Sequence, residues 1–115
     1  MAVDSLSVTA SKFRACLLAA LQGDCLGAPF EGEWYPVAPS VYTRYFAGLK
    51  SKPNLPYKPF TDDTAMTKSV AASLVAHNGF NAEDMARRFV DEFYAEPRRG
   101  YGGSVIHVFE KLHLV

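Results

Sequence analysis

The sequence predicts an all-α fold. Apolar residues recur every three or four positions in several stretches of the 115-residue chain, as they do along one face of a helix. No stretch shows a convincing alternation of apolar and polar residues with the period of two that marks a half-buried strand. Hydrophobic residues make up 49% of the chain and charged residues 21%. This composition is ordinary for a soluble globular protein, and the length is that of one domain or part of one.

The first helix is expected to begin near Ser11, with Thr9 or Ser11 as its cap, after a disordered start over residues 1–10. Pro29 should end it, because the proline ring opposes the carbonyl four residues earlier. Three apolar residues recur at intervals of four and give this helix a broad apolar face: Phe13, Leu17 and Leu21.

A long connection rich in proline and aromatic residues is predicted over residues 32–60, with one short helix near residues 40–49. A connection of this kind inside a compact domain is more often a functional lid than filler. Packing against the core is the alternative for its aromatic residues, and we favour it for most of them: Trp34, Tyr35, Tyr42 and Tyr57.

Three more helices are predicted in the second half of the chain. The first covers residues 62–77 and ends at the Asn-Gly pair of residues 78–79, which is a helix stop signal. The next begins at Asn81, which is suited to capping, and ends before Pro97. The last begins near Ser104.

Charge and cysteine content narrow the class of protein. Lys plus Arg equals Asp plus Glu at 12 each, which gives no reason to expect nucleic acid or an anionic membrane as partner. No apolar run approaches the ~20 residues that span a bilayer. Two cysteines, Cys16 and Cys25, without a secretion signal predict a reduced intracellular protein. Residues 1–14, with three serines and one acid, are weakly compatible with a transit peptide.

Residues 61–67 are the strongest chemical motif. They place two adjacent carboxylates, Asp62 and Asp63, between the hydroxyls of Thr61 and Thr64. Oxygen atoms of these kinds suit a hard cation such as Mg²⁺ or Ca²⁺. The same residues would also cap a helix and complement the positive end of its dipole. On these residues alone, both interpretations stay open.

Two more carboxylates, Asp24 and Glu31, and one loop could each have a functional role or an ordinary structural one. Asp24 is predicted in the last turn of the first helix, where the helix dipole disfavours an acid; such conflicts gather at functional sites, although a solvent-facing side chain explains it equally well. Glu31 is either a carboxylate on a mobile segment or an ordinary surface acid. Residues 98–103 hold two arginines, a tyrosine and three glycines. They suit a phosphate or nucleotide, or form a plain turn between helices.

These motifs resemble the ADP-ribosylglycohydrolase family. Residues 23–31, Gly-Asp-Cys-Leu-Gly-Ala-Pro-Phe-Glu, are similar to its first signature, and residues 60–66, Phe-Thr-Asp-Asp-Thr-Ala-Met, to its second. Residues 99–102, Arg-Gly-Tyr-Gly, resemble the branch that removes ADP-ribose from serine and degrades poly(ADP-ribose). The resemblance runs from about Phe13 to Leu112, and two ordered signatures at this spacing are specific.

The resemblance implies an orthogonal multi-helix fold and two Mg²⁺ ions in a cleft that hold the ribose hydroxyls of ADP-ribose. It implies that Thr61, Asp62 and Asp63 ligate Mg²⁺. It further implies that Glu31 contacts the second ion and acts as general acid/base. Asp24 is expected to support the metal ligands without binding an ion itself.

The resemblance also implies the substrates and partners. They are ADP-ribose, ADP-ribosylated proteins and poly(ADP-ribose), with no membrane and no sequence-specific nucleic acid, and the complete protein is expected to be a monomer. Gly100, Tyr101 and Gly102 are expected to bind substrate. The expected compartments are the cytoplasm and nucleus, with the mitochondrial matrix open, and the expected context is the DNA damage response.

The domain of this family is much longer than this chain, and two of the family's features are absent here. They are the Asp-rich third signature, Gly-Gly-Asp-Thr-Asp-Thr, and the central Gly/Ser/Tyr loop that binds the diphosphate. Residues 11–115 are therefore predicted to be the N-terminal part of such a domain. The alternative is a catalytically inactive fragment or short isoform that acts at most as a binding module. Prenyl-diphosphate chemistry is disfavoured, because residues 62–66 carry no acid after the first pair.

Overall fold

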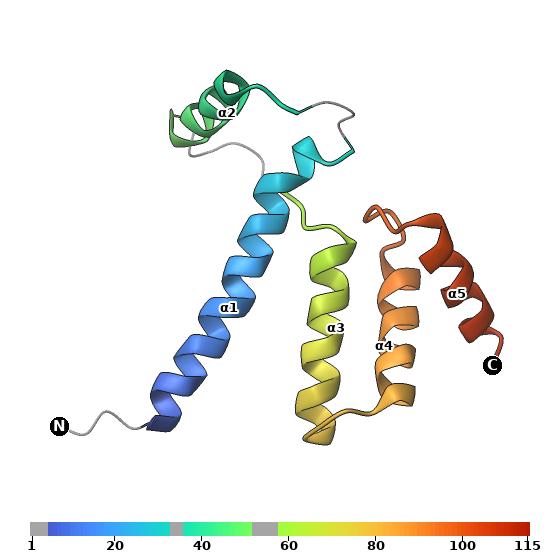
Figure 1. The fold of residues 1–115 in the computed structure, drawn as a ribbon. Helices are drawn as coiled ribbons and strands as arrows, with labels where there is room; N and C mark the ends of the chain where they lie inside the picture. The colour runs from blue at the N-terminus through green and yellow to red at the C-terminus, as the bar shows by residue number, and fades with distance from the viewer. Residues whose placement is uncertain (1–4, 33–35, 52–57) are drawn as a thin grey trace.

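The structure, a computed structural model, describes residues 5–32, 36–51 and 58–115 of the protein. Every regular element in this part of the chain is a helix, which confirms the predicted all-α class (Figure 1). In chain order the elements are α1 (Ser5–Gly27), the 3₁₀ helix η1 (Ala28–Phe30), α2 (Pro39–Ser51), α3 (Asp62–His77), α4 (Ala82–Ala95) and α5 (Gly103–His113).

Helix α1 begins earlier than the sequence analysis predicts. It starts at Ser5, so the expectation of a disordered start is wrong for residues 5–10, which are helical. Thr9 and Ser11, the two expected caps, lie inside the helix. The physical reason is that residues 5–10 contain neither proline nor glycine, so nothing in them ends a helix that extends backward from Ser11.

Helix α2 confirms the short helix predicted near residues 40–49 and extends slightly beyond both ends. Pro29 lies in η1, just after α1 has ended, as its ring predicts. Phe30 then packs edge-on against Tyr42 and Tyr45 of α2, with ring centroids 4.8 Å and 5.0 Å apart. Tyr42 thus packs against Phe30 and not against the core of α3, α4 and α5, and it stays 38% exposed. The other three aromatic residues of that prediction lie outside the described residues: Trp34, Tyr35 and Tyr57.

Helices α3 and α4 form a hairpin whose ends are set by side chains that the sequence identifies (Figure 1). At the end of α3, Asn78 takes the left-handed conformation with φ 50°, and the Gly79 N–H donates to the Leu74 carbonyl at 3.1 Å. At the start of α4, the Asn81 side-chain oxygen accepts from the Asp84 backbone N–H at 2.9 Å. Local signals at both ends therefore fix this turn.

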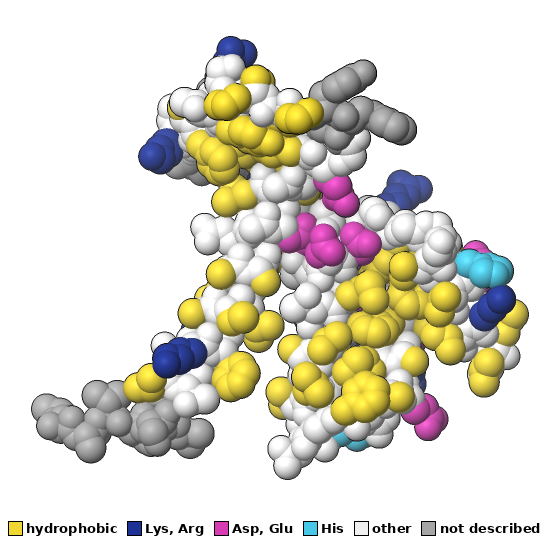
Figure 2. All heavy atoms as spheres, viewed as in Figure 1, with side chains coloured by type: hydrophobic (Ala, Val, Ile, Leu, Met, Phe, Trp, Pro, Cys, Tyr) yellow, Lys and Arg dark blue, Asp and Glu magenta, His cyan; other side chains and the backbone are white. Residues whose placement is uncertain are grey.

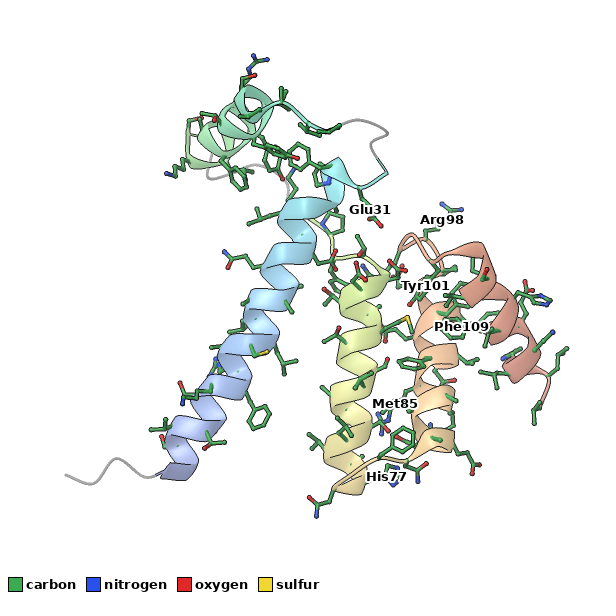
Figure 3. All side chains as sticks on the ribbon, viewed as in Figure 1. Glu31, His77, Met85, Arg98, Tyr101 and Phe109 are labelled. Carbon is green, nitrogen blue, oxygen red and sulfur yellow. The ribbon has the colours of Figure 1, made fainter. Side chains whose placement is uncertain are left out.

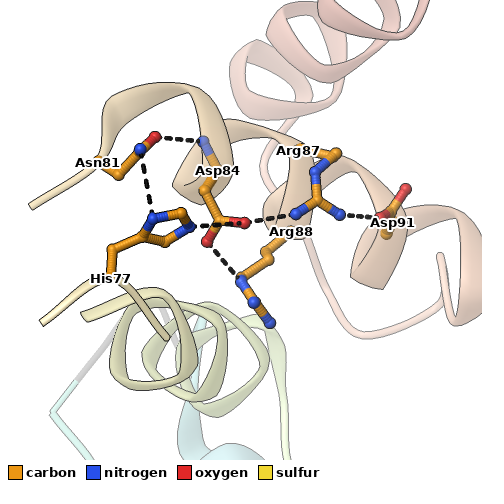
Figure 4. A network of polar contacts seen from close by, with 6 residues as sticks. All are labelled: His77, Asn81, Asp84, Arg87, Arg88 and Asp91. Atoms are coloured by element: carbon orange, nitrogen blue, oxygen red, sulfur yellow. Dashed lines mark hydrogen bonds and ion pairs between the residues drawn. The ribbon is translucent and has the colours of Figure 1, made fainter. Parts of the chain in front are cut away.

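A buried carboxylate fastens α4 to the end of α3 (Figure 4). Asp84 is only 6% exposed. It accepts from Arg88 Nε at 2.7 Å, accepts a second hydrogen bond from Arg87, and lies 3.4 Å from His77 Nε2. The hydrogen bond from Arg88, helped by Ser73, opposed by burial and helped less by His77, holds the pKa of Asp84 well below its ordinary value. His77 is the last residue of α3, a helix-end position as predicted.

The core lies among α3, α4 and α5. Its aromatic centre is formed by Phe93, Tyr101 and Phe109, whose ring centroids are 5.0 to 5.9 Å apart. Val90 and Ala65 complete the set of buried apolar residues in the described part of the chain. This core positions the beginning of α3 and the loop between α4 and α5, which frame the candidate site.

Helix α1 approaches α3 at its C-terminal end and diverges from it toward its N-terminus (Figure 1). Its predicted apolar face exists but is open, since Phe13 is 69% exposed and Leu17 45%. Figure 2 shows hydrophobic side chains gathered on this helix and on the face formed by the other helices. No helix in the described part of the chain is long and apolar enough to span a membrane.

Candidate active site

One carboxylate joins the end of α1 to the beginning of α3. Asp24 accepts four hydrogen bonds from two threonines that lie 37 and 40 residues further along the chain. Thr61 donates through its backbone N–H at 2.9 Å and its hydroxyl at 2.7 Å. Thr64 donates through its backbone N–H at 3.2 Å and its hydroxyl at 2.6 Å. The beginning of α3 is therefore positioned by α1 as well as by its own cap.

The electrostatics of Asp24 explain why a carboxylate is tolerated at the end of α1. The negative end of the α1 dipole disfavours it, but its oxygens face the first N–H groups of α3, where the dipole is positive. Burial raises the pKa of Asp24, and the hydrogen bonds from Thr64 and Thr61 outweigh burial and lower it below its ordinary value. Asp24 is thus a partly buried, ionised anchor, and the solvent-facing interpretation is wrong.

Thr61 fills the capping role, one of the two that the sequence left as alternatives, and its geometry leaves the other role open. It is the N-cap of α3, and its Oγ1 accepts weakly from the Asp63 backbone N–H at 3.4 Å. Because the hydroxyl gives its only hydrogen to Asp24, its lone pairs point away from that carboxylate. A threonine oxygen oriented in this way is suited to contact a cation as well as to cap the helix.

Asp62 is held by the loop between α4 and α5. Its backbone N–H donates to the Arg99 carbonyl at 2.8 Å. Arg99 in turn donates from Nη1 to the Phe60 carbonyl at 2.8 Å, and its guanidinium lies 3.7 Å from the centroid of the Phe60 ring. Gly100 has φ +87°, and a Cβ there would lie 3.9 Å from Asp62 Oδ1. The loop therefore sets the position of Asp62 relative to the core.

An acidic pocket lies between the end of α1 and the beginning of α3. It has a volume of about 510 Å³, and its lining includes Asp24, Glu31 and Asp63. Glu31 is exposed just beyond η1 (Figure 3). Its backbone N–H donates to the Ala28 carbonyl at 3.2 Å, and its side chain makes no hydrogen bond or ion pair with any described residue. Three of the predicted carboxylates thus line one pocket. The fourth, Asp62, is not among its lining residues, and its Oδ1 lies near Gly100.

The donor set of this pocket fits a hard divalent cation. The pocket is lined by the carboxylates of Glu31 and Asp63, and the hydroxyl of Thr61 donates to its lining residue Asp24. Carboxylate and hydroxyl oxygens are ligand types that Mg²⁺ accepts. Within residues 5–32, 36–51 and 58–115, however, no three acidic, histidine or cysteine side chains are gathered closely enough to hold a metal ion by themselves. The pocket therefore offers the right types of ligand for Mg²⁺, but fewer carboxylates than a complete metal site needs.

The three residues predicted to bind substrate lie in different environments. Gly100 and Gly102 are exposed in the loop before α5. Tyr101 is 7% exposed in the aromatic core, and its hydroxyl is buried without a hydrogen-bond partner among the described residues. Burial, and then the charges of Glu92 and Asp62, raise the pKa of Tyr101. Its position favours packing, and its substrate contact stays a prediction.

Sequence reasoning offered Thr64 only as an oxygen donor for a cation and Arg99 only as one arginine of a glycine-rich loop, and it did not predict the contacts that position the site. Thr64 makes the shortest hydrogen bond to Asp24, and Arg99 links residues on both sides of Thr61 to the second loop. The symmetry of Thr61 and Thr64 around the carboxylate pair was the signal available for Thr64. No pattern in the sequence signals the partners of Arg99, because they lie about 40 residues earlier in the chain.

The fold and this arrangement of acids and threonines define the class of protein. Residues 5–114 match the family model described as ADP-ribosylglycohydrolase, and the chain belongs to that family of glycosyl hydrolases. Among its relatives are proteins named ADP-ribosylhydrolase ARH3. That of Xenopus tropicalis is 45% identical over 103 residues, which are 89% of this chain and 29% of that protein.

Two further ARH3 relatives match this chain with similar identity and coverage. The Gallus gallus protein is 43% identical over 112 residues, and the Homo sapiens protein 41% identical over 108 residues. Each alignment covers 89% of this chain and 30% of the relative. The chain thus spans about three tenths of the length of these relatives, and the match supports the predicted resemblance to their branch.

Proposed function

We propose that this chain contributes to the Mg²⁺-dependent hydrolysis of the glycosidic bond that links ADP-ribose to serine side chains or joins units of poly(ADP-ribose). The observation that carries the proposal is the acidic pocket, which Asp24, Glu31 and Asp63 line, and in which Asp24 accepts the hydroxyl hydrogen of the neighbouring Thr61. Family membership and the names of the relatives support the reaction class.

The residues that would hold Mg²⁺ are Thr61, Asp62, Asp63 and Glu31. When bound, the ion supplies positive charge that orients a ribose diol and lowers the pKa of a coordinated oxygen. Asp24 contributes by fixing the Thr61 hydroxyl, whose hydrogen it accepts at 2.7 Å between the two oxygens. This contact uses the hydroxyl hydrogen of Thr61 and leaves its lone pairs available to a cation.

Glu31 is the proposed general acid/base. Glycosidic cleavage passes through an oxocarbenium-like state and needs a proton given to the leaving group or taken from water. Glu31 has no competing partner among the described residues and lines the pocket, so its carboxylate is free to exchange a proton with substrate. Its place beyond η1, next to Gly32 with φ +80°, suits a carboxylate that adjusts on binding.

The alternative is that the 115-residue chain binds without hydrolysing. The chain spans 29% to 30% of the ARH3 relatives, and its described residues hold no complete carboxylate cage. In that case it would act at most as a binding or interaction module for ADP-ribose or ADP-ribosylated proteins. The predicted compartments, cytoplasm and nucleus or mitochondrial matrix, are part of the proposal under either alternative.

The test is release of ADP-ribose from a serine-ADP-ribosylated peptide by the purified chain in Mg²⁺. We expect release that EDTA abolishes and that Glu31→Gln reduces about 10²–10⁴-fold, the usual contribution of a positioned acid/base. Glu83→Gln is the matched control, because Glu83 is an exposed acid in the first turn of α4. Equal rates in both variants would exclude Glu31 from the reaction.

Absence of release by the chain favours the binding alternative, which a second measurement then tests. Calorimetric titration with ADP-ribose in Mg²⁺ should give heat of binding that Asp62→Ala plus Asp63→Ala removes. If the chain neither hydrolyses the peptide nor binds ADP-ribose, the function belongs to neither alternative for this polypeptide.

A further inference from the structure

A second, differently charged pocket adjoins the acidic pocket. It has a volume of about 650 Å³ and lies between the end of α1, the segment before α3 and the loop that follows α4. It shares Ala28 with the acidic pocket, and Thr61 is part of its wall. We call it the basic pocket, after the charged residues that line it: Lys58, Glu96, Arg98 and Arg99. Its volume is in the range of small-molecule sites.

The basic pocket carries an excess of positive charge. Three cations and one anion give its lining a formal charge of +2, that is +3 from Lys58, Arg98 and Arg99 and −1 from Glu96. None of the four makes an ion pair with another residue in the described part of the chain. This contrasts with α4, where Arg87 and Arg88 are paired with Asp84. The positive charge of the basic pocket is therefore available to a ligand.

Arg99 gives the basic pocket a rigid wall. Its guanidinium stacks 3.7 Å from the Phe60 ring centroid and donates to the Phe60 carbonyl at 2.8 Å. Because its partners are an aromatic ring and a neutral carbonyl, its charge is not cancelled by a carboxylate. Its Nε is buried and has no hydrogen-bond partner among the residues that the structure describes. The site thus holds an unneutralised guanidinium in a fixed place, with Lys58 and Arg98 exposed beside it.

We propose that the basic pocket binds a small phosphate ester through its phosphate group, with Lys58 and Arg98 in ionic contact with the phosphate and Arg99 as the charged wall. A dianionic phosphate matches the formal charge of the lining, and guanidinium groups pair with phosphate oxygens more effectively than with neutral acceptors. The apolar side of the pocket, Pro29 and Pro59, suits the carbon skeleton of an ester. This binding needs neither Mg²⁺ nor cleavage of a glycosidic bond.

The test is an NMR titration of the ¹⁵N-labelled 115-residue chain with ribose 5-phosphate, in low salt with EDTA. We expect amide shifts at Arg99, Gly100 and Thr61, and none with ribose, which lacks the phosphate. Lys58→Ala and Arg98→Ala should each weaken binding about twofold to fivefold, as expected for exposed ion pairs. Glu96→Gln should tighten binding by a similar factor, because it removes the opposing charge.

Lys111→Ala is the matched control, because Lys111 is an exposed cation on α5 outside the basic pocket. It should leave the dissociation constant unchanged. Equal weakening by Lys111→Ala and Lys58→Ala would reveal nonspecific attraction and overturn the proposal. So would equal binding of ribose, shifts confined to other parts of the chain, or equal affinity for inorganic phosphate. The hydrolase proposal is judged by Mg²⁺-dependent product release, so either proposal can fail while the other stands.

Discussion

Asp24 disfavours the helix that carries it and stabilises the contact between two helices. It lies in the last turn of α1, where the dipole is negative, but its side chain meets the positive end of α3 and four donors. The balance favours the charged form, since the pKa of Asp24 is lowered despite burial. The same contact fixes the hydroxyl of Thr61, so structural and chemical roles share one side chain.

We expect Asp24→Ala to lower the free energy of unfolding by about 1–2 kcal/mol. Hydrogen bonds to a charged group are worth ~1.5–3 kcal/mol when buried, and partial exposure of Asp24 reduces that value. Urea denaturation followed by circular dichroism measures the change. Asp91→Ala is the control, because Asp91 is 69% exposed and should change stability by less than ~0.5 kcal/mol. Equal losses in the two variants would mean that Asp24 does not anchor α3.

Acidification should destabilise the protein through Asp24 and Asp84. Both have a folded-state pKa below the ordinary value of 3.8, so their stabilisation is present above that value and is lost as pH falls through the lower folded values. Unfolding free energy measured from neutral pH downward should therefore decline below about pH 4. Asp24→Asn and Asp84→Asn should each flatten the decline. Asp91→Asn should preserve it, and an unchanged slope in all three variants would contradict the assignment.

The residues of the candidate site were predictable where their signal was local. Thr61, Asp62 and Asp63 stand together in the sequence at a helix start, so their type and spacing identify them. The partners of Asp24 could not be predicted from its own position, because they lie 37 and 40 residues away and depend on how α1 meets α3. Such long-range contacts are set by tertiary packing, which local propensity does not contain.

At the scale of elements, the hairpin of α3 and α4 was predictable because both ends of its turn carry capping residues. Asn78 and Gly79 stop α3, and Asn81 starts α4. The start of helix α1 was misplaced, because Thr9 and Ser11 are capping residue types that lie inside the helix. Element boundaries were thus predictable where capping residues, glycine or proline mark the end of a helix in the sequence.

The cap of α4 gives a test at this scale. Asn81→Ala removes the acceptor of the Asp84 N–H, whose hydrogen bond is 2.9 Å long, and should cost about 1 kcal/mol. Asn81→Ser keeps a capping oxygen and should recover most of that loss. Midpoints of urea denaturation compare the three proteins. If serine and alanine lower stability equally, the cap is not the source of the effect, and the 3.5 Å contact between Asn81 Nδ2 and His77 Nδ1 becomes the explanation.

At the scale of the whole molecule, stability is concentrated in one part of the chain. The buried apolar residues lie on α3, α4, α5 and the loop before α5, while α1 meets this body only near its C-terminal end. Periodicity predicted the apolar face of α1 but not its exposure to solvent. A stripe of apolar residues has the same spacing in the sequence whether it is buried against another element or exposed. The family resemblance came from two local signatures, and the pockets around them required the fold.

A pair of matched phenylalanine substitutions tests where the folding free energy resides. Phe93 is 6% exposed among Tyr101 and Phe109, so Phe93→Ala should cost about 3–5 kcal/mol through lost burial and a cavity. Phe13 is 69% exposed on α1, so Phe13→Ala should change stability by less than ~0.5 kcal/mol. Urea denaturation at low and high protein concentration measures both. A large cost for Phe13→Ala at every concentration would place α1 against the body of the protein, and a cost that grows with concentration would mean that its open face packs against a second copy of the chain.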